Sequence, residues 1–191
     1  MRILLIFILL LLFAFFFLKG SKIERSSVKP IFLRIDTIAE NHQTDIEVKV
    51  HSMYEPDSME LKTLKEDYSN IWAHLNHLYA TNDIVSGKEY YTENWFKQLA
   101  HHYVQPNAPL IQRKDTQHEL HIQNWTTDGL VCTAIDSNLV FRYIFPDKSE
   151  KNTKADLAVV LLYQGDHWRI DAMRILNETS IHNLTNTLNT K

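Results

Sequence analysis

Residues 155–176 read ADLAVVLLYQGDHWRIDAMRIL, and this stretch predicts a β-hairpin. Strand-forming residues fill 155–164 and 167–176, and Gly165 and Asp166 between them favour a tight turn. Successive side chains of a strand point to opposite faces, and here both faces of the first strand are apolar. One face carries Leu157, Val159, Leu161 and Tyr163, and the other carries Ala158, Val160 and Leu162. Both faces must therefore be covered, one by helices and the other by a partner protein, a second copy of the chain or an N-terminal hairpin.

The second strand of this hairpin carries a tryptophan that we expect in the core. By the period of two, Trp168 shares a face with Ile170 and Ala172, and Asp171 shares the other face with Arg169 and Met173. Carboxylates are rarely buried in mid-strand without a partner. Asp171 is therefore either a base in a cavity between helices and sheet or a residue of a solvated face.

The region before this hairpin first predicts helices and then more strands. Asp57 and Ser58 signal a helix start, and apolar residues then recur every three or four positions over 61–79. A second helix is expected from Thr92. A period of two begins near residue 118, with a turn at 127–129, strands over 130–135 and 139–145, and a bulge or turn between them. Helices followed by antiparallel strands indicate an α+β fold, with helices packed on a strongly bent sheet.

The N-terminus predicts a membrane anchor. Residues 3–18 are all apolar, and basic residues flank them on both sides. As a helix this run is roughly 24 Å long, and flanking Arg2 and Lys19 can extend it across a bilayer. A cleaved signal peptide and a hydrophobic element of the fold are the alternatives, but the residues before a cut at Gly20 or Ser21 suit cleavage poorly. The basic residues that follow the run favour a cytoplasmic domain by the positive-inside rule, whereas a short N-terminus with one Arg before a long Leu/Phe run is the usual layout of an export signal. Of these two orientations we expect a single-pass protein with its domain on the extracytoplasmic side.

The predicted organisation has five parts. Residues 1–20 form the signal anchor, 21–30 a linker, 31–53 a β-hairpin extension, 54–176 the α+β domain and 177–191 a polar tail that frays. Ile31, Leu33 and Ile35 alternate in one arm of the extension, and Ile46, Val48 and Val50 alternate in the other. Residues 146–154 are expected to be a polar loop.

Composition excludes several classes of function. The net charge is −3 and the basic residues form no stripe, so we expect no nucleic-acid partner. The chain has four glycines and no phosphate-binding glycine motif, which argues against a nucleotide site. Cys132 is the single cysteine, so no intrachain disulfide forms. We expect no cofactor.

Residues 90–95 (YYTENW) and residues 159–171 (VVLLYQGDHWRID) carry a family resemblance. Together with the helix order, they resemble the NTF2-like (cystatin-like, SnoaL-like) superfamily over roughly residues 55–176. The resemblance implies a cone-shaped α+β domain. Its members include small isomerases and cyclases, transport factors, and membrane-anchored periplasmic subunits of conjugation machines such as VirB8-like proteins. An anchor followed by this domain is most similar in layout to the last group.

The histidines do not predict a metal site. His74 and His77 lie three residues apart on the first helix, and His118 and His121 would point to opposite sides of a strand. Zinc needs three or four converging ligands, normally including a carboxylate or cysteine. We therefore expect these histidines on the surface or at polar edges, where replacing His74 or His77 leaves the melting point almost unchanged.

Two functions remain open from the sequence. The first is a non-catalytic binding or assembly module, whose partner or second copy contacts the sheet face of residues 155–164. The second is a binder of small apolar ligands, or an isomerase-like enzyme, that uses the cavity between helices and sheet. The pocket candidates are Trp72, Tyr79, Tyr91, Trp95 and Asp171. Aromatic residues at helical spacing also suit a core, and no catalytic constellation is evident.

Overall fold

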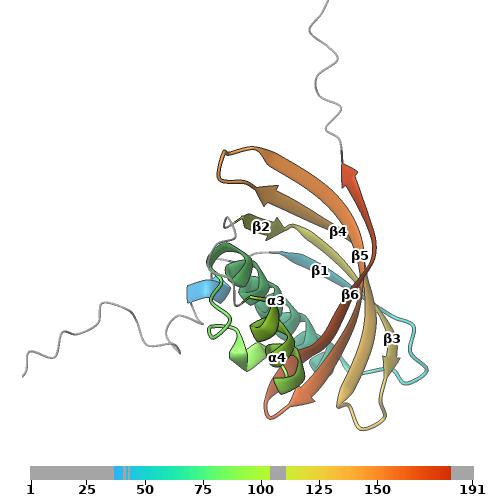
Figure 1. The fold of residues 1–191 in the computed structure, drawn as a ribbon. Helices are drawn as coiled ribbons and strands as arrows, with labels where there is room; N and C mark the ends of the chain where they lie inside the picture. The colour runs from blue at the N-terminus through green and yellow to red at the C-terminus, as the bar shows by residue number, and fades with distance from the viewer. Residues whose placement is uncertain (1–36, 41, 43, 104–110, 182–191) are drawn as a thin grey trace, which may run out of the picture. The chain divides into compact units, whose positions relative to one another are not determined.

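Two helices pack on one face of a curved β-sheet in the computed structural model (Figure 1). The structure describes residues 37–40, 42, 44–103 and 111–181, all of which belong to one unit of the chain, residues 31–191. Helix α3 covers Ser58–Thr81, α4 covers Glu93–His102, and the short 3-10 helix η1 (Lys88–Tyr90) lies between them. This arrangement confirms the α+β class.

The sheet has six strands and is antiparallel except at one edge. Its strands are β1 (Asp45–Val50), β2 (Gln112–Asp115), β3 (Gln117–Trp125), β4 (Val131–Ile144), β5 (Glu150–Gln164) and β6 (His167–Ile181). Their order is β1-β3-β4-β5-β6, and β2 also pairs with β4. Strand β1 pairs in parallel with β3. The expectation of a purely antiparallel sheet is therefore wrong at this edge.

Local capping explains where both helices begin. The Asp57 carboxylate accepts hydrogen bonds from the backbone N–H groups of Met59 and Glu60, and Glu60 accepts one from the Asp57 N–H. This reciprocal pairing satisfies N–H groups that a helix start leaves unpaired. The Thr92 hydroxyl accepts the N–H of Trp95 in the same way. Both predicted helix starts are confirmed.

The core lies between the helices and the inner face of the sheet. Trp168 is 2% exposed, and its ring lies 4.8 Å from that of Trp125 and 5.4 Å from that of Tyr163. Its backbone N–H donates to the carboxylate of Asp67 on α3 at 2.8 Å. The predicted core position of Trp168 is confirmed, and the strand is joined to α3 at Asp67.

The last hairpin is longer at its open end than the sequence predicts. Strand β5 begins at Glu150, inside the expected polar loop, and β6 continues to Ile181, inside the expected tail. Cross-strand pairs such as Thr153 with Ser180 satisfy the backbone there, although the side chains are polar. Residues 182–191, the rest of the expected tail, lie outside the described residues.

Two bulges change which residues face the core. Strand β4 runs without a turn through residues 136–138, so the bulge and not the turn is the correct alternative. In β6, Ile170 pairs with Leu161 but Met173 pairs with Val159, and the extra residue lies between them. Met173 therefore shares the inner face with Trp168 and Ile170. The prediction that Ala172 shares that face is wrong.

The N-terminal predictions are only partly covered by the structure. The second arm of the expected 31–53 hairpin is strand β1, which extends the sheet beside β3, while residues 37–40 are helical. The first arm, at residues 31–35, lies outside the described residues, as do residues 3–18. Within the ranges that the structure describes, no helix has the length and hydropathy of a membrane span.

Candidate functional site

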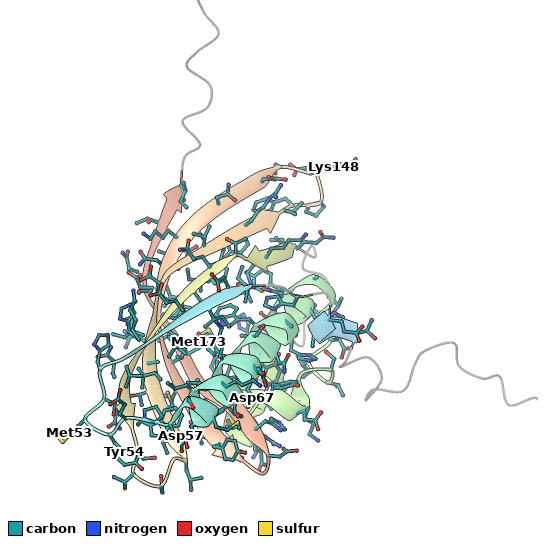
Figure 2. All side chains as sticks on the ribbon, turned by 180° about the vertical axis from the view of Figure 1, so that it is seen from behind. Met53, Tyr54, Asp57, Asp67, Lys148 and Met173 are labelled. Carbon is teal, nitrogen blue, oxygen red and sulfur yellow. The ribbon has the colours of Figure 1, made fainter. Side chains whose placement is uncertain are left out.

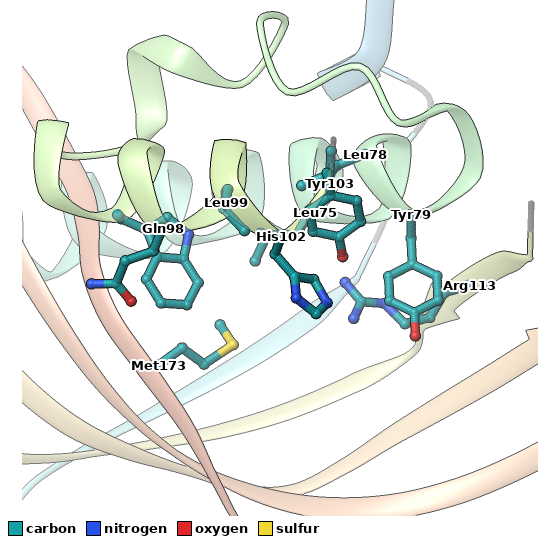
Figure 3. Close-up of a pocket in the computed structure, with 10 residues that line it drawn as sticks. Leu75, Leu78, Tyr79, Gln98, Leu99, His102, Tyr103, Arg113 and Met173 are labelled. Atoms are coloured by element: carbon teal, nitrogen blue, oxygen red, sulfur yellow. The ribbon is translucent and has the colours of Figure 1, made fainter. Parts of the chain in front are cut away.

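A cavity of about 390 Å³ lies between the two helices and the sheet (Figure 3). Its wall combines leucines and aromatic rings of α3 and α4 with Arg113 of β2 and Met173 of β6. The lining residues are Leu75, Leu78, Tyr79, Trp95, Gln98, Leu99, His102, Tyr103, Arg113 and Met173. The volume falls in the range of small-molecule sites, about 300–1,000 Å³.

The structure brings two of the five predicted pocket residues to this cavity. Tyr79 and Trp95 line it, whereas Trp72 and Tyr91 are core residues that are 0% and 2% exposed. Asp171 lies at the bulge of β6 and accepts a hydrogen bond from the Thr92 hydroxyl at 2.7 Å. Asp171 thus holds the start of α4 against the sheet.

Eight of the ten lining residues were not predicted, and Arg113 is the one among them with a permanent charge. Its Nε donates to the side chain of Asn76 on α3 at 3.0 Å. Its guanidinium lies over the rings of Tyr79 and Phe141, 4.6 and 4.9 Å from their centroids. No sequence pattern marks Arg113, because β2 is only four residues long and has no apolar residues to alternate with polar ones.

A buried network of polar side chains connects α3 to strands β2, β3 and β4 of the sheet. His118 on β3 donates from Nε2 to Asp115 at 2.9 Å and from Nδ1 to Asp136 at 2.6 Å. The Tyr68 hydroxyl donates to Asp136 at 2.7 Å, and the His42 ring lies 2.9 Å from Asp115. The side chains of Asp115, His118 and Asp136 have no exposed surface.

Pairing of opposite charges decides the protonation of His118 and Asp115 in this network. Burial disfavours the charged imidazolium, but the bonds to Asp115 and Asp136 outweigh it and raise the pKa of His118 to about 9. Burial likewise opposes ionisation of Asp115, but hydrogen bonds from His118 and His42 hold its pKa well below the usual range. His118 is therefore a cation between carboxylates. Because none of the three side chains reaches solvent, the geometry fits a structural role.

The prediction of surface histidines is wrong for His74 and His118, which are 0% and 1% exposed. The ring of His74 stacks on that of Tyr90 at 4.9 Å, and burial lowers the pKa of His74 to about 4. His121 does point away from His118, toward the outer face of the sheet. Over the described part of the chain, no three His, Cys, Asp or Glu side chains are grouped to hold a metal ion.

The outer face of the sheet carries a second candidate site, which we call the outer apolar patch. It comprises Val131 and Ile135 of β4, Ala158, Val160 and Leu162 of β5, and Ala172 of β6. All six side chains are half-buried, and so is Thr133, the polar residue that pairs with Val160 inside the patch. The alternating residues of β4 and β5 that face the helices are buried, namely Cys132, Ala134, Leu157, Val159 and Leu161. Both α3 and α4 pack on the other face (Figure 1), and among the described residues nothing covers this patch.

Charged and polar residues border the outer apolar patch. Arg169 and Arg174 of β6 pair with Leu162 and Ala158, and His121 of β3 pairs with Ile135. Exposed Leu130 lies at the turn before Val131, and exposed Met53 projects from the loop that joins β1 to α3 (Figure 2). An apolar centre with a polar rim is the usual composition of a protein interface.

The fold of this chain is similar to that of a solved structure. No family model matches the chain, and no curated protein matches it. The similar structure is the crystal structure of an IcmL-like type IV secretion system protein from Legionella pneumophila. It is 19% identical, the match covers 68% of this chain and 97% of the other, and the TM-score is 0.36.

Proposed function

We propose that this chain is a non-catalytic assembly module that binds another protein, or a second copy of itself, through the outer apolar patch. One observation carries the proposal: residues 157–162 of β5 are apolar on both faces, and the helices cover only one. Soluble monomers rarely leave a contiguous apolar surface open. The described part of the expected N-terminal hairpin lies at the sheet edge and not on this patch.

We also propose that this module is held at a membrane. Residues 3–18 anchor the chain in a membrane, and an NTF2-like domain of VirB8-like layout stands on the extracytoplasmic side. The uninterrupted apolar run and its flanking basic residues support the anchor.

The test compares two matched charge insertions in the intact protein, purified in detergent. Val160→Lys places a cation in the centre of the outer apolar patch, whereas Val85→Lys does so at an exposed position after α3. We expect Val160→Lys to weaken association at least roughly tenfold, because a buried interface leaves the lysine unpaired. Sedimentation velocity measures association with a second copy, co-purification from native membranes measures association with another protein, and thermal unfolding checks the fold. Association that survives Val160→Lys in a folded protein sinks the proposal.

The cavity supports a second candidate, the binding of a small ligand. Its ten lining residues include no carboxylate, and the pair of Tyr68 and Asp136 is fully buried behind it. Proton abstraction from a ligand requires a base within hydrogen-bond reach. His102 is the lining side chain that could take this role, so ligand binding and isomerase-like chemistry both remain candidates for the cavity.

A further inference from the structure

The cavity between α3, α4 and the sheet has a charged end and an apolar end. At the charged end, Arg113 of β2 lies beside the ring of Tyr79. Arg113 is also close to Tyr103: burial raises the pKa of the Tyr103 phenol, and the charge of Arg113 lowers it in part. Figure 3 shows His102 on the same side. Leu99 of α4 and Met173 of β6 form apolar wall elsewhere.

The position of Arg113 is set before any ligand arrives. Asn76 accepts from its Nε, and Asn76 is itself held by a hydrogen bond to the buried carboxylate of Asp115. Three rings, of Trp72, Tyr79 and Phe141, flank the guanidinium within 5.4 Å. A cation fixed in this way loses little conformational entropy when it binds an anion.

Arg113 has no direct ion-pair partner within the described part of the chain. Among the described residues, no Asp or Glu lines the cavity. Its hydrogen bond to Asn76 uses only one of five N–H donors. A guanidinium presents the remaining donors as a fork that matches a carboxylate.

We propose that this cavity binds a carboxylic acid with a compact apolar body. The carboxylate pairs with Arg113, and the apolar body packs on Trp95, Leu99 and Met173. The fixed cation accounts for the anionic group, and the leucine, methionine and tryptophan wall accounts for the apolar one. This inference rests on the second candidate function, ligand binding in the cavity, for which it names the ligand class, and it does not depend on the outer apolar patch.

The test uses 4-phenylbutyrate and its neutral analogue 4-phenylbutanol as probes. The intact chain, reconstituted in lipid nanodiscs with methyl-labelled methionine, is titrated and followed by NMR. Met173 lines the cavity, whereas Met53 and Met59 are exposed and report nonspecific binding. We expect the acid to shift the Met173 resonance saturably and to bind at least roughly tenfold more tightly than the alcohol.

Two matched variants locate the anion. Arg113→Gln and Lys114→Gln each remove one positive charge from β2, but Lys114 is exposed and does not line the cavity. We expect Arg113→Gln to remove the preference for the acid and Lys114→Gln to keep it. A Met173 resonance that ignores the acid, or equal affinity for acid and alcohol in the parent protein, overturns the proposal. This comparison in the parent holds even if Arg113→Gln fails to fold.

Discussion

Replacing Trp168 by alanine tests the packing of the core more sharply than any other single change. The side chain is 2% exposed and lies against the rings of Trp125 and Tyr163. Truncating a buried tryptophan costs about 3–5 kcal/mol, and the two lost aromatic contacts favour the upper part of that range. A domain of this kind has a total stability of about 5–15 kcal/mol. We therefore expect Trp168→Ala to lose about a quarter or more of the free energy of unfolding.

Urea denaturation of the chain without residues 1–20, followed by circular dichroism, measures this loss. Trp95→Ala is the matched control, because Trp95 is half-buried at the cavity wall and its truncation leaves the core intact. We expect the control to cost about 1 kcal/mol. A Trp168→Ala protein that unfolds at the same urea concentration as the control would show that the core is not built around this hairpin.

Three further changes test other parts of the structure. The pKa of His118 is raised to about 9, so its contribution to stability is complete below its unfolded pKa of about 6.5 and is lost as pH rises through 9. The free energy of unfolding, measured by urea denaturation, should therefore fall between these two pH values in the parent and fall less in His118→Phe. An equal fall in both proteins contradicts the ion-pair assignment. Burial lowers the pKa of His74 to about 4, so the parent protein should lose stability as pH falls from 6.5 to 4, and His74→Phe should remove this loss. His74→Ala leaves a cavity and should lower the free energy of unfolding by about 2 kcal/mol. A Cβ at Gly87 would lie 2.5 Å from the ring of Tyr91, so Gly87→Ala should lower stability by about 1–3 kcal/mol, and an unchanged melting temperature would contradict this packing.

The sequence was most informative where local chemistry and periodicity agree. Asp57 caps α3 and Thr92 caps α4 because both side chains reach backbone N–H groups within three residues. The turn at Gly165 adopts a positive φ of 81°, which glycine tolerates and most residues do not. Such signals are local, so they can be recognised without knowing the tertiary structure.

The sequence was least informative where distant residues decide the structure. Residues 150–154 are polar, yet they form a strand because β4 pairs with all of them and β6 pairs with residues 152–154 on the other side. The bulge in β6 moves Met173 to the inner face, and no motif marks it. His118 is buried because Asp115 and Asp136 neutralise it from other strands. Arg113 was missed because its partners lie on α3 and β4.

Site-specific photo-crosslinking in native membranes tests the central claim, that the outer apolar patch binds a protein. The intact chain carries p-benzoylphenylalanine at position 160, in the centre of the patch, or at position 85, which is exposed on the loop after α3. Irradiation followed by mass spectrometry identifies what each position contacts. The proposal predicts one discrete adduct from position 160, with a second copy or a single partner protein, and none from position 85. Absence of an adduct from position 160, or the same adducts from both positions, would contradict it.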